Sequence, residues 1–156
     1  MFSGVRPTIV LLAAASLAAS LWLEPAPLEA AAPSSATRYA RAAFNATNDE
    51  RVERDRARLR QDACLQRFAT RWARHMAHTG RLVHQGLNPI ASRCQLSYTG
   101  ENIAMGFPSG RAVVRGWIHS PGHKENILRP QYRVMAIGAA KDEHGRWWSS
   151  QVFGRR

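Results

Sequence analysis

The spacing of apolar residues predicts helices in the first half of the chain. Between Asp62 and Gly80, apolar residues recur at every third or fourth position, which predicts an amphipathic helix with a capping Asp and a terminating Gly at its ends. A weaker stripe with the same spacing over residues 37–54 predicts an earlier helix. Ser109 and Ser120 each precede a short helical segment, and serine is a favoured N-cap residue.

The second half of the chain carries strand patterns. Residues 132–141 and 146–154 are apolar, β-branched and aromatic runs on either side of a turn, which predicts a β-hairpin. A short strand is predicted around residues 102–104. The segments 55–60 and 81–97 are polar or rich in turn residues, and they are predicted to be connections. Helices first and a hairpin last predict an α+β fold, with helices packed on an antiparallel sheet.

The first thirty residues carry the pattern of an export signal. Arg6 precedes an apolar run over residues 9–23, which at about fifteen residues is shorter than the roughly 20 that a membrane-spanning helix needs. Prolines and small residues follow this run. We therefore predict a signal peptide over residues 1–30, a linker over residues 31–37 and a secreted or periplasmic protein without a stable membrane span. An uncleaved N-terminal anchor is the alternative.

Export determines how the two cysteines are interpreted. In an oxidising compartment, Cys64 and Cys94 are most simply one disulfide, and on the chain-entropy model such a bridge stabilises by about 3.5 kcal/mol. Two buried free thiols are the alternative. Since the chain has no second pair of cysteines, a structural zinc site built from four thiolates is excluded.

The charge balance favours anionic surroundings. The chain has 22 Lys and Arg residues against 11 Asp and Glu residues, a formal net charge of +11. The stretch from Arg51 to Arg60 is rich in arginine, and it is either a solvated helix end with charges of both signs or a site for anionic envelope polymers or lipid head groups. No aromatic residues are interleaved with these arginines, so we expect no nucleic-acid binding. The chain also lacks a glycine-rich phosphate loop.

An ordered set of motifs resembles a known family. Gly-Glu-Asn-Ile-Ala at 100–104 is followed by Trp-Ile-His-Ser-Pro-Gly-His at 117–123, Asn-Ile-Leu at 126–128 and a terminal Val-Phe-Gly at 152–154. Together with the flanking segments, this set resembles the CAP superfamily of cysteine-rich secretory proteins, antigen 5 and pathogenesis-related 1 proteins, and its short bacterial members above all. The resemblance implies a CAP domain over residues 38–154, folded as a three-layer α-β-α sandwich around a small antiparallel sheet.

The resemblance also implies a cleft with two His and two acidic residues that binds divalent metal in some members. His84 and His123 stand at the two His positions, and Glu101 stands at the first Glu position. Ser120 occupies the place of the second Glu, which leaves three protein ligands and a position for water. Two imidazoles and one carboxylate are a recognised zinc set, so zinc or another divalent cation is the cofactor that these residues could hold. The alternative is that the three side chains only brace the cleft.

The remaining histidines are weaker candidates. His75 and His78 lie three residues apart on one predicted helix and could bind metal together, but a solvated helix face is the simpler interpretation. His119 is close to the predicted site in sequence and could replace the missing carboxylate, whereas His144 belongs to the hairpin turn.

The predicted function is binding. No Gly-x-Ser-x-Gly elbow is present, and no acid is evident that would orient Ser120 and a neighbouring histidine for nucleophilic catalysis. We therefore predict an exported, monomeric, non-catalytic binding module for lipid or anionic cell-envelope components. The alternative is a metal-dependent hydrolase in which Glu101 acts as the base.

Overall fold

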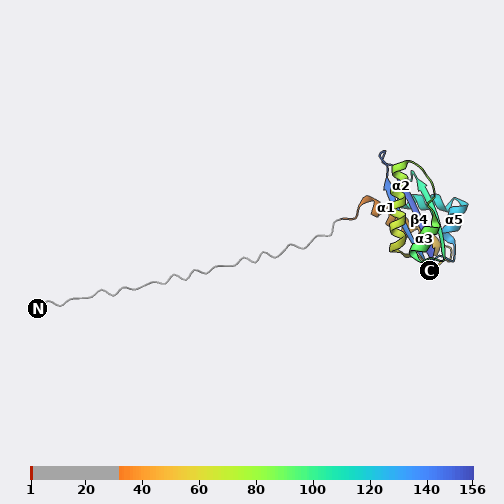
Figure 1. Cartoon of the computed structure of the whole chain (residues 1–156), viewed down its shortest axis with the longest axis horizontal. Helices are drawn as coiled ribbons and strands as arrows, with labels where there is room; N and C mark the ends of the chain where they lie inside the picture. The colour runs from red at the N-terminus through yellow and green to blue at the C-terminus, as the bar shows by residue number, and fades with distance from the viewer. Residues whose placement is uncertain (2–31) are drawn as a thin grey trace. The chain divides into compact units, whose positions relative to one another are not determined.

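The computed structural model describes Met1 and residues 32–156 (Figure 1). Apart from Met1, the predicted signal peptide lies outside the described residues. Ala32–Arg156 is a compact unit that contains all three described core clusters and the disulfide. Its elements are α1 (Ser35–Val52), β1 (Arg60–Gln61), α2 (Ala63–Thr79), α3 (Leu87–Cys94), β2 (Tyr98–Met105), α4 (Gly110–Ile118), α5 (Pro121–Leu128), β3 (Val134–Lys141) and β4 (Trp147–Arg155).

The ends of the predicted helices are confirmed to within two residues. At the start of α2, the Asp62 carboxylate accepts a hydrogen bond from the Leu65 amide at 2.9 Å. At its end, Gly80 adopts the left-handed backbone conformation with φ of 65°, which residues other than glycine rarely adopt. Helix α1 begins after Ser34, whose hydroxyl accepts from the Thr37 amide at 3.2 Å. No described helix is both long and apolar enough to pass through a bilayer.

The sheet has the strand order β1-β3-β4-β2. Strands β3 and β4 form the predicted hairpin, and β4 pairs antiparallel with β2, in which Glu101 lies opposite Val152. The two-residue strand β1 pairs with β3 in parallel, so the sheet is mixed and not wholly antiparallel as predicted. Strands β1 and β2 therefore form the two outer positions of the sheet.

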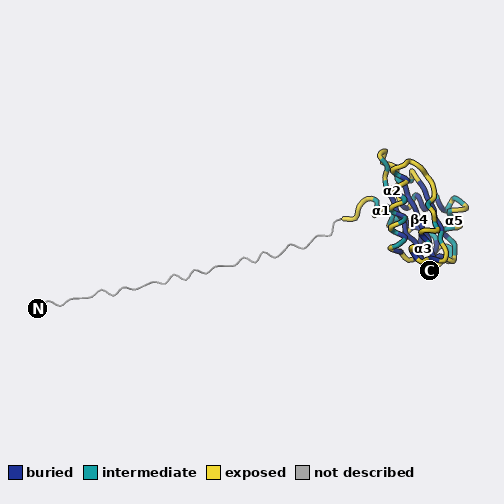
Figure 2. The backbone as a smooth tube through the Cα atoms, in the orientation of Figure 1, coloured by how far each residue is buried: buried dark blue, intermediate teal, exposed yellow. Residues whose placement is uncertain are grey.

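Three layers follow from the alternation of side chains along β3. Met135, Ile137 and Ala139 face a core shared with α1, α4 and α5, while Val134 and Ala136 face a second core shared with α2 and α3. Both faces of the sheet are thus covered by helices. Figure 2 shows the strands buried between helices whose outer faces are exposed. The predicted α-β-α sandwich is confirmed.

Two elements were not predicted. Helix α3 lies within the segment 81–97 that we expected to be a connection, because Pro89 and its turn-favouring neighbours fall in the first turn of the helix, where proline is tolerated. Strand β1 is too short to leave a hydrophobic pattern, and it exists through backbone bonds that include Arg60 N to Arg133 O at 3.0 Å and Asp62 N to Met135 O at 3.2 Å.

The predicted disulfide joins the two helices on one face of the sheet. Cys64 in the first turn of α2 is bonded to Cys94 at the end of α3, with 5.7 Å between their Cα atoms. The described residues contain no free cysteine, so the alternative of two thiols is excluded. The bridge fixes the course of the chain between α2 and β2, which carries His84 and Gln85.

The arginine stretch after α1 divides into buried and surface residues. Arg51 is fully buried, and its guanidinium donates to the carbonyl oxygens of Ala57, Ile127 and Arg129. Burial, together with nearby arginines, lowers its pKa to about 10. The expectation of a solvated end is therefore wrong for Arg51, which instead ties α1 to the end of α5.

Candidate functional site

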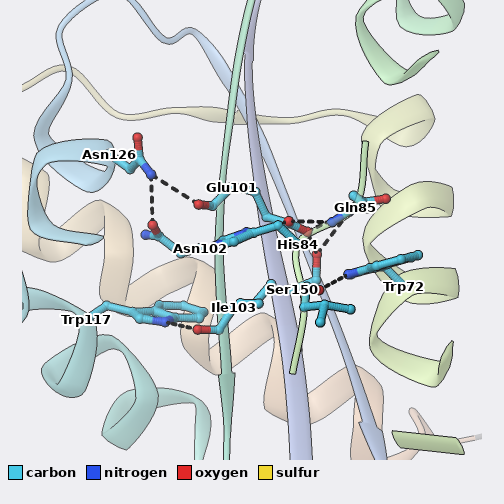
Figure 3. A network of polar contacts seen from close by, with 10 residues as sticks. Trp72, His84, Gln85, Glu101, Asn102, Ile103, Trp117, Asn126 and Ser150 are labelled. Carbon is cyan, nitrogen blue, oxygen red and sulfur yellow. Dashed lines mark hydrogen bonds and ion pairs between the residues drawn. The ribbon is translucent and has the colours of Figure 1, made fainter. Parts of the chain in front are cut away.

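The centre of the site is the carboxylate of Glu101 at the outer edge of β2 (Figure 3). Its side chain is only 1% exposed. One oxygen, Oε2, accepts from the His84 ring at 2.9 Å and the Gln85 amide at 3.2 Å. The other, Oε1, accepts from Gln85 Nε2 and from the Ser150 hydroxyl, both at 2.7 Å. Four donors thus surround the carboxylate, and its charge is balanced by hydrogen bonds despite burial.

The ring of His84 is fixed on one side and open on the other. Its Nδ1 contacts Glu101, while the side chain as a whole is 59% exposed. The segment that carries it is held to α2, because the indole Nε1 of Trp72 donates to the Val83 carbonyl at 2.8 Å. In the tautomer in which Nδ1 carries the proton and donates a hydrogen bond to the Glu101 carboxylate, Nε2 has a free lone pair. The geometry therefore offers an oriented imidazole nitrogen beside the β2 edge.

His123 approaches the same edge from the opposite layer. It lies in the first turn of α5 and is partly buried. Burial lowers its pKa below 6.5, and the nearby His84 lowers it further. The ring of His123 is therefore neutral at neutral pH, which is the form that binds a metal.

Amide side chains fasten α5 to β2 and so position His123. Asn126 Nδ2 donates to the backbone oxygen of Glu101 at 3.1 Å and to Asn102 Oδ1 at 3.0 Å. Asn102 Nδ2 in turn donates to the backbone oxygen of His123 at 3.1 Å and to Gln151 Oε1 at 3.0 Å. This buried network sets the distance between the helix and the strand.

The structure brings two of the three predicted ligands into contact. His84 and Glu101 are hydrogen-bonded, whereas the His123 ring makes no described hydrogen bond to either of them. Across residues 32–156, no group of three His, Cys, Asp or Glu side chains is arranged to hold a metal ion. Ser120, at the place of the absent carboxylate, serves as the N-cap residue of α5. Metal binding at this edge stays a prediction.

The other histidines lie on exposed surfaces. His75 stacks on Trp72 with ring centroids 4.7 Å apart, and His78 is exposed on the same helix. His119 is also exposed, and its Nδ1 bonds to the carbonyl of Arg115 at 2.7 Å. His144 lies in the hairpin turn, as predicted.

Sequence reasoning missed Gln85 and Ser150. Both donate to Glu101, and Ser150 is fully buried. A signal was present, because Ser149, Ser150 and Gln151 interrupt the most hydrophobic predicted strand with polar residues. Buried polar side chains have to be hydrogen-bonded, so such an interruption indicates a polar network on the sheet.

Comparison with known proteins places the chain in context. The model of the Cysteine-rich secretory protein family, CAP, matches residues 44–153. The uncharacterized protein YkwD of Bacillus subtilis is 30% identical over 131 residues, which are 80% of this chain and 50% of that protein. The chain thus spans half the length of this curated relative.

Two solved structures share the fold. An extracellular protein containing an SCP domain from Bacillus anthracis has a TM-score of 0.70 at 23% identity, over 78% of this chain and 41% of that one. An outer surface protein from Borrelia burgdorferi has a TM-score of 0.66 at 20% identity, over 72% of this chain and 89% of that one. With the family model covering well over half of its length, the chain belongs to the cysteine-rich secretory protein family, CAP.

Proposed function

We propose that this protein is an exported, non-catalytic binding protein whose site at the β2 edge holds a divalent metal between His84 and His123. The observation that carries the proposal is the saturation of Glu101 by four hydrogen bonds. A carboxylate that accepts a hydrogen bond from one ring nitrogen of a histidine orients the other nitrogen towards a metal, as carboxylates commonly do in metal sites. Glu101 is then the partner of His84 and not itself a ligand.

The donor set suits zinc. Two neutral imidazoles are zinc ligands at about 2.0–2.1 Å, and the remaining coordination positions would be open to water or to oxygen atoms of a bound molecule. The lowered pKa of His123 keeps its ring available at neutral pH. With two protein ligands in place of three or four, we expect modest affinity.

Anionic envelope components, lipid head groups among them, are the ligand class that we propose. Phosphate and carboxylate oxygens are hard donors that can complete the coordination of a divalent cation. The net charge of +11 attracts such ligands. Export is consistent with relatives described as extracellular or as an outer surface protein.

The geometry disfavours the hydrolase alternative. A general base must be free to accept a proton from water, and it must lie within hydrogen-bond reach of that water. Both oxygens of Glu101 already accept two hydrogen bonds each, and the side chain is buried. The Ser150 hydroxyl donates its hydrogen bond to the same carboxylate, so it is not placed as a nucleophile.

Calorimetric titration with zinc tests the proposed site. We expect His84→Ala and His123→Ala to abolish zinc uptake, and Glu101→Gln to weaken it about 10- to 100-fold through the misplaced His84 ring. Ser120→Glu supplies a further carboxylate and should strengthen binding. His75→Ala is the matched control, since His75 is exposed on α2 and stacks on Trp72. Equal zinc binding by the wild type and His123→Ala would reduce the site to a structural brace.

The ligand class is tested on the protein purified from its own cell envelope. Organic extraction followed by mass spectrometry should recover an anionic lipid or polymer fragment from the wild type. We expect the recovered amount to fall in His84→Ala and to stay unchanged in His75→Ala. Equal recovery from the two variants would separate envelope binding from the β2 edge and contradict the proposal.

A further inference from the structure

The opposite edge of the sheet lacks a strand partner along part of β3. Strand β1 pairs only with Val134 and Met135, so no neighbouring strand covers the outer side of residues 137–141 in the described structure. An uncovered strand edge presents a row of backbone donors and acceptors that can pair with another chain.

The outward backbone groups can be located by alternation. The carbonyl of Met135 accepts from the Asp62 amide, and the carbonyl of Ile137 accepts from the side-chain amide of Gln66 at 2.8 Å. Because outward groups recur at every second residue of a strand, those of Ala139 and Lys141 come next along this edge. Gln66 therefore occupies the Ile137 carbonyl just beyond β1. The backbone groups of Ala139, which is 5% exposed, and of the exposed Lys141 follow it towards the hairpin turn.

This open edge forms the floor of a groove between two helices. A hollow of about 640 Å³ is lined by Ile137, Gly138, Ala139 and Ala140 of β3, with α1 and α2 as its walls. Apart from Ile137, the floor consists of glycine and alanine. Four strand residues span about 13 Å, which suits a short extended segment. Thr70 and Arg74 on α2 and Arg41 on α1 line the walls.

The α2 wall of the groove is basic. Helix α2 contains no Asp or Glu, and Arg67, Arg71 and Arg74 are spaced so that they share its exposed face. A second hollow lined by all three of these arginines continues the groove along α2. Neither these residues nor Arg41 take part in any of the ion pairs of the described chain. A partner with carboxylates would therefore meet positive charges that have no counterpart within the domain.

We propose that the open edge of β3 binds an extended acidic polypeptide, which adds a strand in the groove between α1 and α2. The backbone of the segment pairs with Ala139 and Lys141, and its alternate acidic side chains, which share one face of the added strand, reach Arg74 on the α2 wall. A polyanion without a peptide backbone would use the arginines alone, whereas the row of backbone groups beside them favours a peptide. The site lies across the sheet from His84 and His123 and does not depend on them.

The probe for this site is a fluorescein-labelled hexapeptide of alternating Glu and Val with blocked ends. Binding to residues 32–156, which form a compact unit with their own core and disulfide, is measured by fluorescence anisotropy. We expect saturable binding that weakens with salt. Arg74→Glu should weaken it about tenfold. Arg93→Glu changes the net charge equally on the exposed surface of α3, and it should leave the affinity unchanged.

A second peptide isolates the contribution of the backbone. It has the same side chains, but alternate amides are N-methylated and can neither donate nor lie flat against a strand. We expect it to bind at least about tenfold more weakly than the parent. Equal binding of the two peptides, or equal weakening by Arg74→Glu and Arg93→Glu, would overturn the proposal.

Phosphatidylglycerol vesicles and the zinc-site variant His123→Ala complete the experiment. Vesicle binding that depends on Arg74, with no binding of the peptide, would assign the basic groove to lipid and overturn strand addition. His123→Ala should bind the peptide like the wild type. A loss of peptide binding in His123→Ala would place the peptide at the β2 edge and contradict the site proposed here, independently of the zinc result.

Discussion

The two edges of the sheet are built from different materials. At the β2 edge, buried polar side chains form a network around Glu101 and Asn102, and the two histidines beside it come from opposite layers. At the β3 edge, the floor consists of Ile137, glycine and alanines, and the open groups belong to the backbone. The first edge therefore depends on the identity of a few side chains, whereas the second depends on backbone groups, a floor of mostly small residues and the charge of the α2 wall.

This difference separates two kinds of recognition. A site made of side chains can be abolished by one substitution that leaves the fold intact. A backbone edge can be blocked by bulk or by charge reversal, but no single side-chain deletion removes it. The following predictions test how independent the two edges are, beginning with the largest expected effect.

Loss of the disulfide should weaken both edges together. The double variant Cys64→Ser, Cys94→Ser removes the covalent link between α2 and α3. Helix α2 forms one wall of the groove at the β3 edge, and α3 precedes β2. We expect the free energy of unfolding to fall by about 3.5 kcal/mol, because the unfolded chain gains entropy. Urea unfolding followed by tryptophan fluorescence measures this, with the reduced wild type as a check. A loss that is confined to one edge in hydrogen exchange would contradict a shared effect.

Bulk at Gly138 should damage the β3 edge selectively. A Cβ atom there would lie 2.2 Å from the backbone carbon and oxygen of Ala69, so α2 would have to move away from β3. We expect Gly138→Val to cost about 3 kcal/mol in urea unfolding. Gly122→Ala is the control, because a Cβ atom at Gly122 meets no other atom within 4 Å. Zinc titration of folded Gly138→Val should match the wild type.

Removal of the central amide should damage the β2 edge. Asn102→Leu leaves Gln151, Asn126 and the carbonyl of His123 each without one partner in a buried setting. We expect a loss of about 2 kcal/mol in the free energy of unfolding, together with weaker zinc uptake because α5 is no longer held at its distance from β2. Unchanged zinc affinity would mean that His123 is positioned without this network.

The smallest effect is a pH dependence at His123. Its folded pKa lies below the unfolded value of 6.5, so the unfolded chain binds more protons as the solution becomes acidic. The contribution of His123 to stability is thus complete above about pH 6.5 and declines as the pH falls below it. In metal-free protein, His123→Gln should flatten that part of the stability curve. His144→Gln, in the exposed turn, should leave the curve unchanged.

Local patterns predicted the elements that have local causes. The helix between Asp62 and Gly80 carries its cap, its stop and its apolar stripe in one segment, and the structure confirms all three. The hairpin is confirmed for the same reason. Helix α3 was missed because Pro89 reads as a helix breaker unless it is known to fall in the first turn.

Burial and hydrogen bonding between distant segments could not be predicted in the same way. Arg51 looks like part of a charged surface stretch, yet it donates to the carbonyl of Ile127, 76 positions away in the sequence. Gln85 and Ser150 become partners of Glu101 only because the disulfide-bound segment and β4 converge on β2. Side chains so far apart in the sequence leave no joint periodic signal.

The sequence by itself determined the family, the layered α+β fold and the disulfide, and it pointed to His84, Glu101 and His123 at the β2 edge but not to Gln85 or Ser150. Each of these depends on a contiguous motif, a local period or a pair of cysteines. Only the tertiary structure decided that Glu101 accepts four hydrogen bonds, one of them from the His84 ring. It also decided that β1 pairs with only two residues of β3, beyond which a groove with a basic α2 wall lies at the edge of the sheet. Packing settles such features, because they depend on which distant atoms fill the space around a group.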